Sequence, residues 1–136
     1  MRTIWLCMML AMLGNTAVQA QETQPTKLAQ SFKVTYYEFP DHFTTNLRSG
    51  NKLVQATKAI DTEYEEAVIW RVIKHRLAIA NEIVMLLSNQ TEADLRSPAA
   101  KAKLQDSIRD AVNAVLDSKY HFGGIDHAYI TSLTIQ

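Results

Sequence analysis

The chain has 136 residues, 47% of them hydrophobic, and its 14 basic and 14 acidic side chains leave no net charge. This length predicts one small domain together with a separate N-terminal segment. Because neutralising phosphates needs a clear excess of basic groups, the charge balance argues against nucleic acid as a partner.

The N-terminus, residues 1–20, has the pattern of a secretory signal peptide. Arg2 precedes an apolar run over residues 4–13, and small residues lead up to a cleavage site after Ala20. The alternative is a short uncleaved anchor, although the apolar run is shorter than the roughly 17 to 25 residues that span a bilayer. Cleavage would remove Cys7, the only cysteine, so the exported chain would have no disulfide and no cysteine metal ligand.

A flexible leader is predicted at residues 21–30, which are polar and contain a proline, and the domain itself is expected over residues 31–136. Apolar and polar side chains alternate from Ser31 to Pro40, which predicts a β-strand. A hairpin is predicted next, from a weaker strand, a turn and a further strand at residues 42–47, 48–51 and 52–60.

The period changes after Asp61, and a long helix is predicted over residues 63–87. Thr62 and Glu65 have the spacing of a capping box, with acidic neighbours that suit the positive end of a helix dipole. The predicted core stripe is Ile69, Val72, Ile73, Leu77, Ala80, Ile83, Val84 and Leu87. Further apolar residues lie off this stripe: Val68, Trp70, Ile79, Met85 and Leu86. This excess predicts that two layers, or a second subunit, cover the helix.

Two helix-start signals follow the long helix. Thr91 and Asp94 predict a capped single turn, and Ser97 followed by Pro98 predicts a second helix that reaches about Lys119. Its expected buried face consists of Leu104, Ile108, Ala111, Val112 and Val115.

A Gly-Gly break at residues 123 and 124 precedes the last predicted element, a strand over residues 125–136. Tyr129, Leu133 and Ile135 are expected on one face of this strand. The order of elements predicts an α+β fold, with a small, mostly antiparallel sheet, two helices packed on one face and the C-terminal strand closing the sheet.

The sequence contains no motif for catalysis. The four histidines, His42, His75, His121 and His127, lack metal-site spacing; His121 and His127 could approach each other, but His127 is more simply a half-exposed strand residue. The acidic residues at 61–66 suit a helix start better than paired carboxylates for hydrolysis. We therefore predict a non-enzymatic protein with no catalytic, cofactor-binding or metal-binding residue and no cofactor.

A basic patch in the middle of the predicted long helix is the candidate interface. The charges can be explained as a solvated helix face, but nearby tryptophan and methionine side chains are typical of interfaces. The patch also suits an acidic partner or an anionic lipid surface. The candidate interface residues are Trp70, Arg71, Lys74, His75, Arg76 and Met85.

The order and spacing of several segments between Tyr36 and Gln136 resemble the FliL family of flagellar basal-body proteins. The most informative segment, residues 83–95, is similar to the family's leucine-leucine-serine, threonine, aspartate-leucine pattern. The other similar segments are residues 36–39, 43–47, 53–56, 101–104, 111–116 and 125–136.

The resemblance implies a periplasmic domain that self-associates into rings, is related in fold to stomatin-type scaffolds and lies beside the stator units of the flagellar motor. It implies partners among stator or basal-body proteins, with the inner-membrane surface as a further candidate, and no enzymatic residues. Family members usually have an uncleaved transmembrane helix, whereas this chain begins with a signal-like segment. Ala100 and Ala128 also depart from the family pattern. A second hypothesis is therefore a soluble periplasmic adaptor or binding module of the same fold without a flagellar role.

Overall fold

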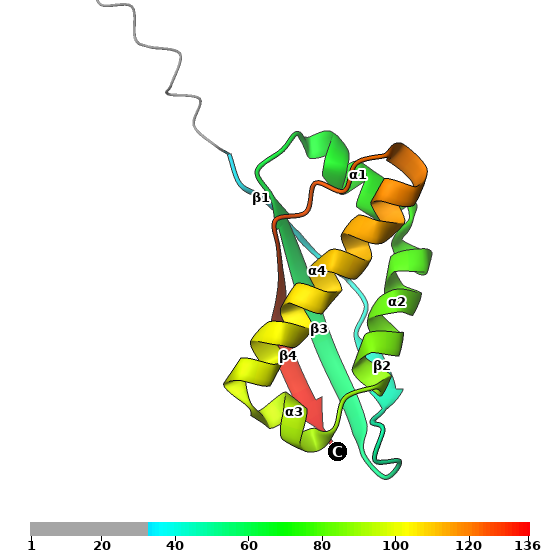
Figure 1. Cartoon of the computed structure of the whole chain (residues 1–136), viewed down its shortest axis with the longest axis vertical. Helices are drawn as coiled ribbons and strands as arrows, with labels where there is room; N and C mark the ends of the chain where they lie inside the picture. Colours follow the sequence, from blue (N-terminus) through cyan, green and yellow to red (C-terminus); the bar gives the residue numbers. More distant parts are fainter. Residues whose placement is uncertain (1–32) are drawn as a thin grey trace, which may run out of the picture. The chain divides into compact units, whose positions relative to one another are not determined.

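A computed structural model of the protein describes residues 33–136, so the predicted signal peptide at 1–20 and the leader at 21–30 lie outside the described residues. Figure 1 shows the arrangement of its helices and strands. In chain order these are β1 (Thr35–Glu38), β2 (Phe43–Asn46), β3 (Leu53–Thr62), α1 (Glu66–Lys74), α2 (Arg76–Ser88), α3 (Glu92–Arg96), α4 (Pro98–Tyr120) and β4 (His127–Ile135).

β3 is the centre of a four-stranded antiparallel sheet. β4 pairs with it along one edge. On the other edge, β1 pairs with residues 59–62 of β3 and β2 pairs with residues 53–56. β1 and β2 therefore act as one edge strand that is interrupted at residues 39–42.

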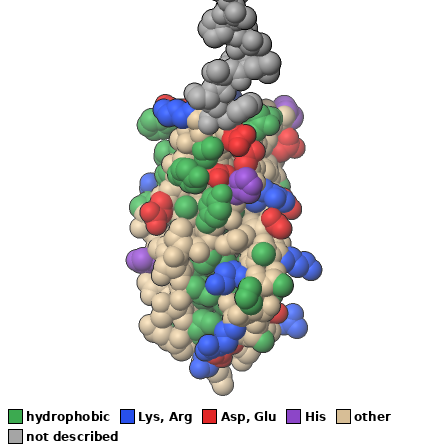
Figure 2. Space-filling model, turned by 90° about the vertical axis from the view of Figure 1, so that its left-hand side faces the viewer, with side chains coloured by type: hydrophobic (Ala, Val, Ile, Leu, Met, Phe, Trp, Pro, Cys, Tyr) green, Lys and Arg blue, Asp and Glu red, His purple; other side chains and the backbone are tan. Residues whose placement is uncertain are grey.

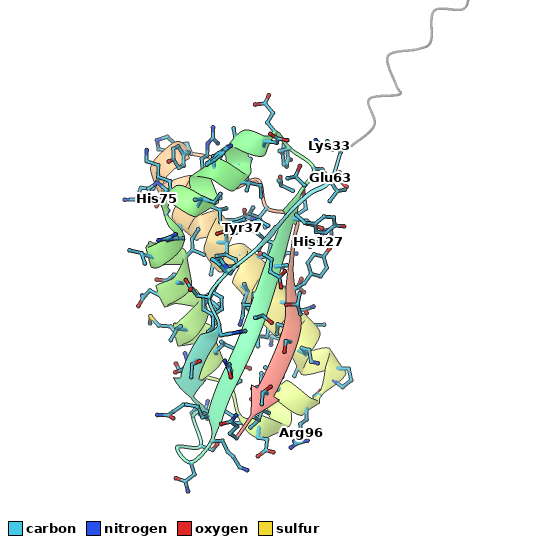
Figure 3. All side chains as sticks on the ribbon, turned by 180° about the vertical axis from the view of Figure 1, so that it is seen from behind. Lys33, Tyr37, Glu63, His75, Arg96 and His127 are labelled. Atoms are coloured by element: carbon cyan, nitrogen blue, oxygen red, sulfur yellow. The ribbon has the colours of Figure 1, made fainter. Side chains whose placement is uncertain are left out.

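The helices lie on one face of this sheet, and the opposite face is uncovered in the views of Figures 1 and 3. Side chains of β3 alternate between the two faces, so Val54, Ala56 and Ile60 are buried beneath the helices. At the end of the chain, Gln136 exchanges two backbone hydrogen bonds with Leu53. The predicted α+β class, with a closing C-terminal strand, is confirmed.

A β-bulge in β4 changes which side chains face the helices. Thr57 pairs with Ser132 but the next residue, Lys58, pairs with Ile130, so one extra residue of β4 is accommodated between them. Because the bulge shifts the alternation, the face that contains Ile130 continues as Leu133 and Ile135 (part-buried in the core). The prediction that Tyr129 shares a face with Leu133 and Ile135 was wrong, since Tyr129 lies before the bulge and faces away from the helices.

The predicted long helix is two helices, because the backbone breaks at His75, with φ −107° and ψ 18°. The helix begins at Glu66, and Thr62 is the last residue of β3 rather than half of a capping box. The Thr62 hydroxyl donates to the Gly124 carbonyl at 2.6 Å and accepts from the Tyr64 amide.

The predicted core stripe of this segment was only partly right. Leu77, which was placed in the stripe, is exposed, whereas Val68 and Ile79, which were placed off it, are buried. The buried side chains of α1 and α2 are Val68, Ile69, Val72, Ile79, Ile83 and Leu87. Four of these six belong to the predicted stripe, so the inward face is largely the predicted one, with Val68 and Ile79 added and Leu77 removed.

The other two helix starts are confirmed. Thr91 and Asp94 form a reciprocal capping box at α3, and the Ser97 side chain accepts from the Ala100 amide with Pro98 in the first turn of α4. The buried face of α4 is Leu104, Ile108, Val112 and Leu116. Leu116 lies one helical turn beyond Val112 and extends the face that the sequence predicted.

Asn113 of α4 fixes the connection to β4. Its side chain amide donates to the Ile125 carbonyl at 2.9 Å, and its carbonyl accepts from the Ile125 amide at 2.8 Å. A Cβ atom at Gly123 would lie 2.5 Å from the Asn113 side-chain oxygen, so only glycine fits there without displacing Asn113. This double hydrogen bond places the start of β4 beside the end of β3.

Candidate interaction surface

The outer surface of α1 and α2 carries large exposed apolar side chains. Trp70 is 68% exposed, Leu77 79% and Met85 52%. Spacings of three and four residues place these three with Lys74 and Asn81, which are also exposed. We call this set (Trp70, Lys74, Leu77, Asn81 and Met85) the α1–α2 stripe. Of the apolar residues that the sequence placed off the core stripe, only Trp70 and Met85 belong to this set. Val68 and Ile79 are buried, Leu86 is half-buried, and Leu77 joins the exposed set instead.

Two of the predicted interface residues instead hold α1 against α4. The His75 ring lies 2.9 Å from the Tyr120 hydroxyl through Nε2, and the Arg71 guanidinium lies 4.8 Å from the centre of the Tyr120 ring. Both side chains are half-buried. Arg71 and His75 therefore fix the junction of α1 and α2 on the end of α4, and are less available to a partner than the sequence suggested.

Two exposed cations belong to this surface, Lys74 within the stripe and Arg76 beside it. Within residues 33–136 neither forms an ion pair. Arg76 and Leu77 also line a small apolar pocket of about 50 Å³ between α2 and the connection that joins β1 to β2. Of the six predicted interface residues, Trp70, Lys74, Arg76 and Met85 thus share an exposed surface, whereas Arg71 and His75 face Tyr120.

A second polar site, which the sequence did not predict, lies at the end of β3. Asp61 is only 4% exposed, and its carboxylate accepts three hydrogen bonds. His127 donates two of them, from its backbone amide at 2.8 Å and from Nδ1 of its ring at 3.0 Å, and the Tyr129 hydroxyl donates the third at 2.7 Å. Because an ionised carboxylate only accepts, Nδ1 carries the proton and Nε2 faces outward. Asp61 was predicted to favour a helix start; it is a buried strand residue instead.

The Asp61 carboxylate changes the pKa of the Tyr129 hydroxyl. Its hydrogen bond to the Asp61 carboxylate, followed by burial and by the negative charge of Asp61, raises the pKa of Tyr129 to about 12. The phenol therefore stays protonated at neutral pH and acts as a hydrogen-bond donor. A nucleophile needs the opposite, a lowered pKa or a free base beside it.

The same end of the sheet carries a cluster of exposed aromatic rings. The Tyr36 and Tyr129 ring centres are 6.4 Å apart, and those of His127 and Tyr129 are 6.0 Å apart. Figure 3, which views the sheet from behind, places His127 near Glu63 at this end. In Figure 2 hydrophobic, acidic and histidine side chains gather in the upper part of the face shown, whereas lysine and arginine side chains lie among hydrophobic ones in its lower part.

The alternative in which His121 and His127 approach each other at a metal site, which the sequence disfavoured, has no support in the described part of the chain. There, no three histidine, cysteine, aspartate or glutamate side chains are placed to hold a metal ion. His127 is bound to Asp61 through Nδ1 and its side chain is 61% exposed, which agrees with its interpretation as a half-exposed strand residue.

The fold and these two surfaces define a small α+β domain with exposed apolar and aromatic surfaces. A family model described as flagellar basal body-associated protein FliL matches residues 36–136. The chain is also 26% identical over 101 residues to a "Flagellar protein FliL" of Aquifex aeolicus (strain VF5), which covers 74% of this chain and 60% of that protein. The chain belongs to the FliL family of flagellar basal body-associated proteins, as the sequence resemblance predicted.

The matched segment of this chain spans 60% of the length of the Aquifex protein. Within residues 33–136, the helices are too short or too polar for any of them to cross a bilayer.

Proposed function

We propose that the protein is a non-enzymatic scaffold that acts beside the stator units of the flagellar motor and supports rotation and motility. In this proposal it is exported and works in the periplasm, at the inner membrane and the basal body. Its partners are other copies of itself and stator or basal-body proteins, with the inner-membrane surface as a further contact. Family membership supports the flagellar association.

The exposed α1–α2 stripe is the observation that carries the proposed scaffold role. Burying a large apolar side chain on association stabilises a complex by about 1.5 to 3 kcal/mol, and the stripe offers three such side chains. Positive charge comes from Lys74 within the stripe and from Arg76 beside it. A partner surface with carboxylates and apolar side chains would therefore be complementary. A shallow apolar strip with a charged rim is suited to protein contacts rather than to turnover of a small molecule.

Motility of a gene-deletion strain tests this function. We expect the strain to lose swimming or swarming, and the unaltered gene to restore it. The gene carrying Trp70→Ser with Leu77→Ser should restore motility poorly, because the partner surface is removed while the core is untouched. Val34→Ser, at an exposed apolar residue ahead of β1, is the matched control and should restore motility fully.

The second candidate is a soluble periplasmic adaptor or binding module without a flagellar role. The departure that favours it is the signal-like N-terminus, because a cleaved chain would reach the motor through protein contacts alone. Unchanged swimming and swarming after deletion would contradict the motor scaffold and support this adaptor. If deletion abolishes motility and the stripe variant restores it as well as the unaltered gene does, the flagellar role stands. That result would contradict the role of the stripe as the partner surface.

A further inference from the structure

Lys58 is a buried amine in the core of the domain. It lies on the inward face of β3, between Ala56 and Ile60, and is 1% exposed. Within residues 33–136 its Nζ has neither a hydrogen-bond partner nor an ion-pair partner. Lysine is rarely buried without a partner, because desolvating an ammonium group is strongly unfavourable.

The surroundings of Nζ are apolar. The Phe43 ring lies 4.9 Å away and offers a partial interaction with a positive charge. The facing residue of β4 is Ile130, and the inward face of α4 is aliphatic. The titratable groups on the elements packed nearby are Tyr37 and Glu38 of β1, Asp41 and His42 of the β1–β2 connection, and Arg76 and Glu82 of α2.

None of these groups is an ion-pair partner of Nζ, and burial alone lowers the pKa of Lys58 from 10.5 to about 7.

The edge strand is interrupted beside this amine. β1 pairs with residues 59–62 of β3 and β2 with residues 53–56, so the ladder is broken opposite Lys58. One backbone hydrogen bond, from the Phe39 amide to the Lys58 carbonyl at 3.0 Å, holds the start of the connection. The Phe39 and Phe43 rings meet edge to face with centres 5.5 Å apart. Both rings are buried, and together they close the edge of the core over the lysine.

We propose that residues 39–43 form a latch over Lys58, which is closed while the amine is neutral and opens when the amine takes up a proton. Opening has to release the backbone hydrogen bond of the Phe39 amide and the pairing of Phe43 with Ala56 at the start of β2. It also separates the Phe39 ring from its edge-to-face contacts with the rings of Tyr37 and Phe43. In the open state the ammonium group reaches water and the exposed carboxylate of Asp41. The closed state offers it neither.

The latch lies beside the α1–α2 stripe. Residues of the connection form one wall of the small pocket whose other wall contains Arg76 and Leu77. Movement of the connection therefore alters the surface next to these two residues, so that local pH regulates the availability of this part of the stripe. The latch itself is a property of the folded chain and does not depend on the proposed motor function.

The direction of the pH effect follows from proton binding. The closed state has a Lys58 pKa of about 7, and the open state has the ordinary value of 10.5. Between these values the open state binds a proton that the closed state does not, so each unit fall in pH raises the ratio of open to closed about tenfold. Below about 7 both states are protonated and the ratio levels off.

Native-state amide hydrogen exchange of the full chain, corrected for the intrinsic pH dependence of exchange, tests the latch. We expect the opening constant of the Phe39 amide and its neighbours in β1 and β2 to rise about tenfold per unit as pH falls from about 9 to 7. Amides of β4, on the opposite edge of β3, should have much smaller opening constants at every pH, because they are released only by global unfolding. In Lys58→Met the slope should disappear, while the exposed-site control Lys103→Met should retain it.

The possible outcomes are distinct. A slope in β1 and β2 that Lys58→Met abolishes, with opening constants well above those of β4, supports the latch. Equal opening constants at the two sheet edges show global unfolding and overturn it, as does the absence of any slope in the unaltered chain. If Lys58→Met does not fold, the comparison of the two sheet edges in the unaltered chain still decides between these outcomes.

Discussion

At the scale of single residues, Asp61 is the best-connected side chain of the outer sheet face. Its carboxylate joins the end of β3 to the start of β4 through the His127 amide, the His127 ring and the Tyr129 hydroxyl. Hydrogen bonds to charged acceptors are stronger than neutral ones. Asp61 therefore fixes the register of the two longest strands at one end and orients the aromatic cluster of Tyr36, His127 and Tyr129.

Removing the Tyr129 hydroxyl tests this role. Tyr129→Phe should lower the free energy of unfolding by about 1 kcal/mol, because Asp61 loses a donor and the ring is partly exposed to water. The melting temperature of the variant, compared with that of Tyr36→Phe, measures the effect. Tyr36 lies on the same face but is 65% exposed, so its hydroxyl should be dispensable. Equal stability of the two variants would contradict the role of the bond.

The pH dependence of the same bond has a defined sign. The pKa of Tyr129 is raised from 10.0 to about 12 in the folded protein. The stabilisation from this hydroxyl is therefore fully present below pH 10 and is lost as pH rises towards 12. Chemical denaturation across this range should show a steeper loss of stability in the unaltered chain than in Tyr129→Phe.

The sequence did not predict these residue-level sites, because their partners are distant along the chain. Asp61 lies 68 residues from Tyr129 in the sequence. The acidic residues at 61–66 are also typical of a helix start, which is how Asp61 was interpreted. Lys58 could have been noticed, since it occupies an inward position in the alternation of Val54, Ala56 and Ile60. Its lack of a partner could not, because that depends on the side chains of α2, α4 and β4.

At the scale of elements, local signals predicted helix starts well where the capping residues take part in no strand pairing. Only short-range hydrogen bonds are needed at Ser97 with Pro98 and at Thr91 with Asp94, and both caps are in place. Thr62 with Glu65 has a similar pattern, but tertiary pairing extends β3 through Thr62 and gives its hydroxyl to Gly124. The bulge in β4 and the break at His75 each shifted a periodic pattern, so side chains on one side of the irregularity were assigned to the wrong face.

The connection between α4 and β4 depends on one side chain, Asn113. Asn113→Ala should lower the free energy of unfolding by about 2 kcal/mol, because it leaves the Ile125 amide and carbonyl without their partners. Asn81→Ala, the same change at an exposed position of α2, is the matched control and should have little effect. Urea denaturation of both variants measures the difference, and similar midpoints would show that water replaces the Asn113 side chain.

At the scale of the whole molecule, the fold class follows from patterns that survive local errors. Strands with period two precede and follow helices with period 3.6, and the apolar alternation within residues 125–136 indicates a further strand of the sheet. A shift of one residue moves a face but does not change an element into another. The excess of apolar surface on α1 and α2 was also evident from composition, although which residues remained exposed depended on the break at His75.

This excess predicts self-association through the α1–α2 stripe. Light scattering of the full chain over a range of concentrations should show assembly. Trp70→Lys with Leu77→Lys should weaken assembly by at least tenfold in dissociation constant, because a buried apolar side chain contributes about 1.5 to 3 kcal/mol and 1.4 kcal/mol corresponds to tenfold. Val34→Lys, at an exposed apolar residue outside the stripe, should assemble as the unaltered chain does. An unaltered chain that stays monomeric at every concentration, or a stripe variant that assembles equally well, would contradict self-association through the stripe.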